Sequence, residues 1–297
     1  MERPASRQGS LGAVAPGLFV LLWSTGFVGA RYGLPYAEPF TFLAIRLAIA
    51  GALLAAIAAA TRAAWPRTRT QWRHAAVAGL LLHAGYLGGV FTAIHLGVPA
   101  GIAAVIVSLQ PVLTSALVAR LLGDEVTARQ WFGLVLGVLG VALVVLPGTF
   151  GADAAALPAG GVVACLVALA ATTCGTVYQS HHGAGVPLLA GTAVQYGAAT
   201  LVLAVAATLT ETMHVRWTGH FVAAMAWLIV ALSVGAILLL LTLLRRGSAT
   251  RVSSLFYVVP PATAVEAYLI FHERLGAIQL LGMLVAVAGV ALVMVRR

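Results

Sequence analysis

The polar side chains best suited to bind a small molecule lie inside long apolar segments and recur at helical spacing. Hydroxyl, amide and imidazole groups three or four residues apart share one face of a helix, so several such helices could together line one polar pocket. We predict that these residues bind a solute: Trp23, His83, Tyr86, Gln110, Thr176, Tyr178, Gln179, Ser253, Ser254 and Tyr257, with Thr114 and Thr172 on the same faces.

Each of these residues also has a structural alternative. Ser and Thr in apolar helices often bond the backbone of their own preceding turn, and the tyrosines are equally expected as packing aromatics. For Trp23, packing is the stronger expectation. His83 lies near the middle of its segment, where an imidazole facing lipid is costly, so it is expected to face an interior cavity.

Motifs for covalent or metal chemistry are absent from the sequence. It has no GxSxG, no HExxH, no paired aspartates within an apolar segment and no glycine-rich nucleotide loop. Cys165 and Cys174 are nine residues apart on one predicted helix, about 13 Å, which is too far for a disulfide. We therefore expect no catalytic residues, no metal, no cofactor and no ATP hydrolysis by this chain.

The elements that carry these residues are predicted to be membrane-spanning helices. The 297 residues are 61% hydrophobic and only 8% charged, with a mean hydropathy of +1.02, whereas soluble domains have about 25% charged residues. Ten apolar segments are long enough to cross a bilayer: 14–30, 39–60, 75–95, 101–122, 130–146, 160–179, 186–209, 221–244, 249–271 and 275–295.

The arginines predict the orientation of these segments. All seventeen basic residues are Arg, and none forms the basic helical stripe expected of a nucleic-acid-binding protein. With the N-terminus inside, thirteen lie on the cytoplasmic side and three on the other. This bias predicts cytoplasmic N- and C-termini in a bacterial-type inner membrane.

An internal repeat divides the sequence at a fixed offset of 149 residues. Pro111, Asp124 and Gly140 fall on Pro260, Glu273 and Gly289, and Arg46 falls on Gln195. We predict a tail of residues 1–13, a first five-helix repeat of residues 14–148 and a second of residues 149–297. Because five is odd, the second repeat must be inverted, and inverted repeats are a recurring architecture of secondary transporters.

Four further residues are predicted to act as hinges or gates. Pro111 and Pro260 interrupt equivalent segments near their middle, so each should kink its helix and expose backbone next to a central cavity. Arg46 and Glu266 lie at similar depth and are expected to pair, directly or through water, in an external gate or a contact to substrate charge. Alternatively, Arg46 extends to an interface, or Glu266 couples transport to protons.

The Trp23-Ser24-Thr25-Gly26 start, Arg46 and the repeated proline–acid–glycine–glycine block resemble the EamA-type drug/metabolite transporters over nearly the whole chain. Among these the YddG-like amino acid exporters are the nearest in character, although no motif separates them from their relatives. The resemblance implies an all-α, polytopic membrane protein with ten transmembrane helices as two inverted five-helix repeats around a central cavity. It also implies export of small metabolites, chiefly amino acids including aromatic and hydrophobic ones, by alternating access.

The alternatives are a drug or lipid exporter of the same superfamily, or a channel, because inverted repeats do not by themselves require alternating access. The expected partners are a small-molecule substrate and the lipid bilayer, without nucleic acid. The chain is expected to be a monomer or a weak homodimer.

Overall fold

The structure is a computed structural model that describes residues 8–121, 127–150, 157–239, 255–256 and 258–294. Within these residues every regular element is helical, and a single isolated β-bridge joins Ala37 to Val215. The first elements are α1 Gln8–Gly33, α2 Pro39–Ala60, α3 Arg69–Gly79, η1 Leu80–Gly85, α4 Tyr86–His95, α5 Ala100–Val107, α6 Gln110–Leu121 and α7 Ala128–Phe150. The remainder are α8 Ala159–His182, α9 Leu188–Thr210, α10 Gly219–Trp227, η2 Leu228–Ala236, α13 Val259–Phe271 and α14 Ala277–Met294.

Seven helices in the described part of the chain are long and apolar enough to cross a membrane, and the apolar helices Val259–Phe271 and Ala277–Val293 are shorter. The outer faces of the bundle expose large apolar side chains, for example Leu201 at 69% and Leu209 at 78%. Soluble monomers rarely expose so much contiguous apolar surface, whereas lipid is a suitable solvent for it. The prediction of an all-helical membrane protein is confirmed for the described residues.

Helix starts follow local sequence signals. Proline occupies the first turn of α2 at Pro39 and precedes α8 and α9 as Pro158 and Pro187, positions where its missing N–H is not needed. At α3, the Thr68 hydroxyl accepts a bond from the Gln71 N–H at 3.1 Å, and the Gln71 side chain accepts one from the Thr68 N–H. This reciprocal capping box marks the start of α3.

Replacing Thr68 with alanine removes the side-chain cap of α3 and is expected to destabilise the protein by about 1 kcal/mol. For a chain of this size, that corresponds to a fall in Tm of roughly 2–3 °C in purified protein. The control is Thr208→Ala, because the Thr208 hydroxyl bonds only the Val205 carbonyl within its own helix. Equal shifts in the two variants would contradict the capping role.

Two irregularities were not predicted from the sequence. The helix over 69–95 contains the π-helical segment η1, and the helix that begins with α10 continues into the π-helical segment η2. At the 149-residue offset, η1 falls on residues 229–234, which lie inside η2. Single π-helical turns within α-helices are frequent at functional sites.

The interruption predicted at Pro111 takes the form of a break between two helices. The helix ends at Val107 and a new one begins at Gln110, so Pro111 lies in the first turn of α6. Proline is tolerated there because the first helical N–H groups have no intrahelical acceptor. Pro260 likewise lies in the first turn of α13.

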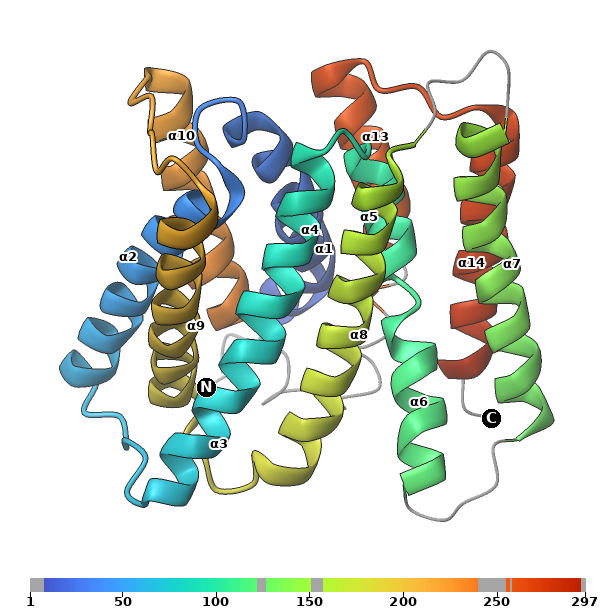
Figure 1. Cartoon of the computed structure of the whole chain (residues 1–297). Coiled ribbons are helices and arrows are strands. Elements are labelled where there is room, and N and C mark those ends of the chain that lie inside the picture. Colours follow the sequence, from blue (N-terminus) through green and yellow to red (C-terminus); the bar gives the residue numbers. More distant parts are fainter. Residues whose placement is uncertain (1–7, 122–126, 151–156, 240–254, 257, 295–297) are drawn as a thin grey trace, which may run out of the picture.

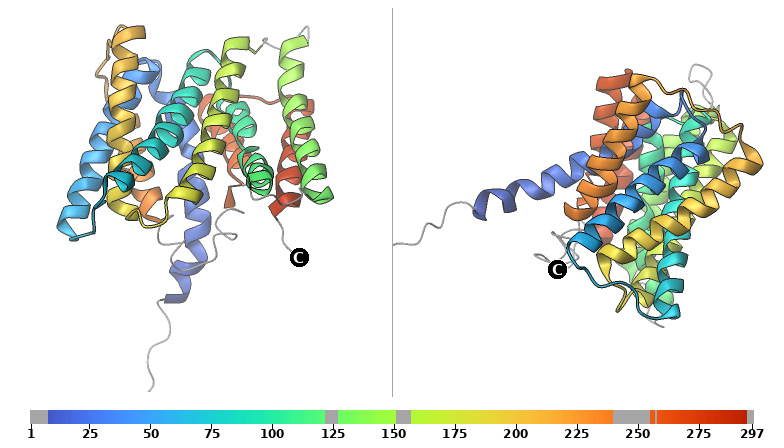
Figure 2. Two further views of the ribbon diagram at one scale, coloured as in Figure 1. Left: turned by 60° about the horizontal axis from the view of Figure 1, so that its bottom comes forward. Right: turned by 90° about the vertical axis from the view of Figure 1, so that its left-hand side faces the viewer.

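The bundle has two edges formed by pairs of tightly packed helices, α2 with α9 and α7 with α14 (Figure 1; Figure 2). Between α7 and α14, Gly133 approaches the Gly289 carbonyl and Gly140 approaches the Gly282 carbonyl. Because the residue numbers of the contacts fall along α14 as they rise along α7, these two helices run antiparallel. Small residues at these crossings permit close approach of the two backbones.

Candidate functional site

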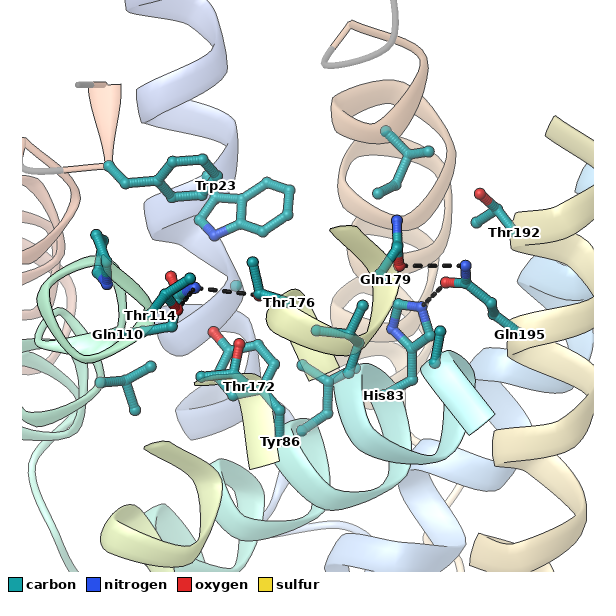
Figure 3. Close-up of a pocket in the computed structure, with 18 of the residues that line it drawn as sticks. Trp23, His83, Tyr86, Gln110, Thr114, Thr172, Thr176, Gln179, Thr192 and Gln195 are labelled. Carbon is teal, nitrogen blue, oxygen red and sulfur yellow. Dashed lines mark hydrogen bonds between the residues drawn. The ribbon is translucent and has the colours of Figure 1, made fainter. Parts of the chain in front are cut away.

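A cavity of about 940 Å³ lies between the two edges of the bundle. This volume is within the ~300–1,000 Å³ typical of small-molecule sites. Of the predicted residues, those that line the cavity are Trp23, His83, Tyr86, Gln110, Thr176, Gln179, Pro111, Pro260 and Arg46, together with Thr114 and Thr172. Figure 3 shows Trp23 above the polar groups that α6, α8 and α9 present to the cavity.

The first polar cluster of the cavity joins three helices. His83 Nε2 donates to Gln195 Oε1 at 3.1 Å, and Gln195 Nε2 lies 3.4 Å from Gln179 Oε1 (Figure 3). The Tyr196 ring packs edge-on against His83 with centroids 4.6 Å apart. The π-helical segment η1 therefore presents an imidazole whose ring is held on two sides.

The second cluster lies at the break between α5 and α6. Gln110 Nε2 donates to Thr114 Oγ1 at 3.0 Å and to Thr176 Oγ1 at 3.1 Å. Ser108, the residue that follows α5, also lines the cavity. Interrupted helices of this kind are where transporters commonly bind their solutes, because backbone groups are freed there.

The third polar group is Arg46, which lies one-third of the way along α2 and is only 3% exposed. Its Nε donates to Ser233 Oγ at 3.2 Å, and its guanidinium carbon lies 5.9 Å from the centre of the Phe91 ring. Its Nη1 is buried and has no hydrogen-bond acceptor in the described part of the protein. Arg46 therefore does not extend to an interface.

The predicted direct pair between Arg46 and Glu266 does not form. Glu266 Oε1 instead accepts a hydrogen bond of 2.6 Å from the Ser24 hydroxyl, and Glu266 is not among the residues that line the cavity. The chain folds so that α1, rather than α2, covers α13 at this depth. Arg46 and Glu266 therefore each form a hydrogen bond with a different hydroxyl group.

Of the four other predicted binding residues, one lies outside the cavity wall and three cannot be placed. Tyr178 lies outside the lining and donates to or accepts from His74 Nδ1 at 2.7 Å, with the His182 ring stacked on it. Ser253, Ser254 and Tyr257 lie outside the described residues. In the described segments, no group of three or more His, Cys, Asp or Glu side chains could hold a metal ion.

The cavity extends towards the arginine-rich face, which we define by Arg62, Arg67, Arg69 and Arg73. Its lining includes His74 near the start of α3 and Gly183 after the end of α8, both at this face. None of the described connections at the opposite end of the bundle contributes to the lining. Among the described residues, the cavity lining thus reaches the arginine-rich end of the bundle and not the opposite end.

At the opposite end, which we call the carboxylate face, glutamates bridge distant parts of the chain. Glu211 accepts hydrogen bonds of 2.7 Å from the N–H groups of Phe40 and Thr41 and from the Thr41 hydroxyl. Glu38 accepts bonds from the side chain and backbone of Thr212, which hold the pKa of Glu38 below its usual value.

Glu273 makes a third bridge at the carboxylate face. It contacts Arg31 at 3.4 Å and accepts a bond from the Ala100 N–H at 3.2 Å. Burial raises the pKa of Glu273, and Arg31 opposes that rise. The net direction follows burial, because Arg31 is 44% exposed and water screens its charge.

Sequence reasoning alone did not single out Gln195, Tyr196, Thr192 and Ser233 as cavity residues. A signal for one of them existed. Gln195 occupies the position of Arg46 at the 149-residue offset. A polar residue in an apolar helix at a position equivalent to Arg46 indicates that it faces the cavity.

Comparison with known proteins agrees with this architecture. The model of the EamA-like transporter family matches residues 11–146 and again residues 159–295. A solved crystal structure resembles the chain in fold with a TM-score of 0.61 at 22% sequence identity, covering 95% of this chain and 96% of the other.

Curated relatives match over most of their length. The "Uncharacterized transporter YvbV" of Bacillus subtilis is 28% identical over 92% of this chain and 88% of its own. The "Uncharacterized inner membrane transporter YedA" of Escherichia coli is 29% identical, covering 92% and 87%. A "Probable amino-acid metabolite efflux pump" of Escherichia coli is 26% identical, covering 92% and 91%. The chain belongs to the EamA-like transporter family and is a membrane transporter.

Proposed function

We propose that the protein is a secondary transporter that exports small metabolites, chiefly amino acids, by alternating access between two inverted five-helix repeats. The observation that carries this proposal is the polar cavity, whose lining extends to the arginine-rich face, while glutamates bridge distant segments at the carboxylate face. A relative named a probable amino-acid metabolite efflux pump supports the substrate class.

Pairs of equivalent contacts support the inverted arrangement. Arg46 of α2 bonds Ser233 of η2, and Gln195 of α9 bonds His83 of η1. The offset of 149 residues carries α2 onto α9 and η1 into η2, so each second helix contacts the third helix of the other repeat. Such exchange of equivalent partners is what a two-fold relation between the repeats requires.

The antiparallel pair α7 and α14 gives independent support. The offset carries Gly133 onto Gly282 and Gly140 onto Gly289, and the close contacts are Gly133 with Gly289 and Gly140 with Gly282. Equivalent helices that run antiparallel belong to oppositely oriented repeats. We infer that the arginine-rich face is cytoplasmic in an inner membrane, and that this structure represents the inward-facing state.

The proposal is tested by efflux and counterflow of a panel of labelled amino acids in proteoliposomes, with and without a pH gradient. Saturable transport of at least one amino acid is expected. Absence of transport for the whole panel would remove the substrate assignment, and unitary currents across a planar bilayer would indicate a channel instead.

Within this assay, Gln195→Leu is expected to reduce transport at least about tenfold, because it leaves the His83 Nε2–H buried without its acceptor. The matched control is Thr200→Val on the same helix. The Thr200 hydroxyl has no hydrogen-bond partner in the described structure and does not line the cavity. Equal activity of the two variants would argue against a role for the His83–Gln195 pair.

A further inference from the structure

The cavity contains a buried guanidinium whose charge no carboxylate of the described residues balances. Arg46 is 3% exposed, and its Nη1 has no hydrogen-bond acceptor among the described residues. A buried cation with an unsatisfied donor is strongly destabilising unless an anion pairs with it. Phe91 and Ser233, its observed neighbours, are neutral groups that cannot supply that charge.

The acidic residues of the chain are placed elsewhere. Of its eight Asp and Glu residues, four lie in the described segments, and none of those four lines the cavity. Glu38, Glu211 and Glu273 are engaged at the carboxylate face, and Glu266 is bonded to Ser24. The stretch 240–254 contains no acidic residue at all.

The two repeats differ in charge at this position, which supports a ligand-binding role for Arg46. The equivalent position in α9 is Gln195, a neutral side chain that is satisfied by His83 and Gln179. Only the Arg46 position carries a permanent charge, although a neutral amide is compatible with the same helix position. A buried charge is costly, and here it occurs at only one of two equivalent positions. This indicates that the charge binds a specific ligand and is not required for helix packing.

We propose that Arg46 binds the carboxylate of the transported solute, and that the cavity provides no matching anion for an amino group. The substrate class is then small organic carboxylates. Amino acids are accepted through their carboxylate, N-acylated or deaminated analogues are accepted as well, and amines that lack a carboxylate are rejected. This proposal deepens the proposed function, since it assumes that the cavity is the translocation site.

Compounds that share a side chain but differ in net charge test the proposal on the purified full-length protein. Phenylalanine, leucine and serine are each used as the N-acetyl amino acid, the free amino acid and the amino acid amide, which are anion, zwitterion and cation at pH 7. Affinity is measured by calorimetry or thermal stabilisation. The anionic and zwitterionic forms are expected to bind within a few-fold of each other, and the amide at least about tenfold more weakly.

Two substitutions connect this preference to Arg46. Arg46→Gln installs the residue found at the equivalent place in α9 and is expected to weaken binding of the carboxylate forms at least about tenfold, which removes the discrimination against the amide. Arg46→Lys keeps the charge and should restore part of the preference. The control is Arg69→Gln, an exposed arginine outside the cavity lining.

The outcomes separate this inference from the proposed function. Amides that bind the wild-type protein as tightly as the free amino acids, or no binding by any probe, would overturn the carboxylate site even if Arg46→Gln does not fold. Amino acid transport that is unchanged in a folded Arg46→Gln protein would overturn it while leaving the transporter assignment intact. Arg46-dependent binding without transport would support the site and contradict the proposed function.

Discussion

Gly140→Leu is expected to abolish the stable packing of α14 against α7. A Cβ at Gly140 would meet the Ala286 N atom and lie 2.6 Å from the Gly282 carbonyl oxygen, and neither backbone atom can move without shifting its helix. Overpacking typically costs about 1–3 kcal/mol, and a leucine against backbone should reach or exceed the upper end. The measurement is the yield and Tm of monodisperse protein by size-exclusion chromatography and thermal denaturation.

A graded series and a control make this result specific. Gly140→Ala should lower Tm less than Gly140→Leu. Gly282→Ala should resemble Gly140→Ala, because its Cβ would lie 2.7 Å from the Gly140 carbonyl. The control is Gly197→Leu on α9, where a Cβ would meet nothing within 4 Å beyond the nearby backbone of its own helix. Wild-type stability of Gly140→Leu would contradict the close approach of these helices.

The second large effect is expected at the carboxylate face. Glu211→Ala removes three hydrogen-bond acceptor contacts of 2.7 Å, two of them to the first N–H groups of α2. Bonds to a charged acceptor contribute about 1.5–3 kcal/mol each, and partial exposure of Glu211 reduces this, so we expect a total loss of about 2–4 kcal/mol. Because these bonds hold α9 to α2 at the carboxylate face, their loss should also favour opening at that face.

Opening is measured by labelling a cysteine inside the cavity. Val90→Cys, in a background without Cys165 and Cys174, is reacted with a membrane-impermeant maleimide applied from the carboxylate face of oriented proteoliposomes. Glu211→Ala should label several-fold faster than its parent, and Glu211→Gln should be intermediate. Thr210→Val is the control, since the Thr210 hydroxyl bonds only the Ala206 carbonyl of its own helix. Unchanged labelling would show that Glu211 does not hold this end closed.

The helix positions were largely predictable because each apolar segment must satisfy its own backbone hydrogen bonds in lipid. The segment 39–60 was predicted to the residue and coincides with α2. The broken helix at Ser108 and the π-helical segments were not predictable, since neither leaves a hydropathy signal. Pro111 signalled an interruption, but whether a proline kinks a helix or starts a new one depends on what packs around it.

The candidate site, like the fold, was predicted only in part from the sequence. His83, Gln110 and Thr176 were identified as polar groups on apolar helices, and they lie in the cavity wall. Tyr178 and Glu266 were identified on the same grounds, yet neither lines the cavity: Tyr178 bonds His74, and Glu266 bonds Ser24. Helical spacing gives the relative direction of side chains on one helix but leaves the rotation of that helix in the bundle undetermined.

The sequence by itself determined the membrane environment, the helical segments and the 149-residue repeat, because these follow from hydropathy and from self-similarity along the chain. Only the tertiary structure decided that Arg46 meets Ser233 rather than Glu266, and that Gln195 meets His83. Those contacts join residues more than a hundred positions apart. They depend on how helices rotate and cross, and in lipid that is set by small differences in packing and hydrogen bonding between helices that are all equally apolar.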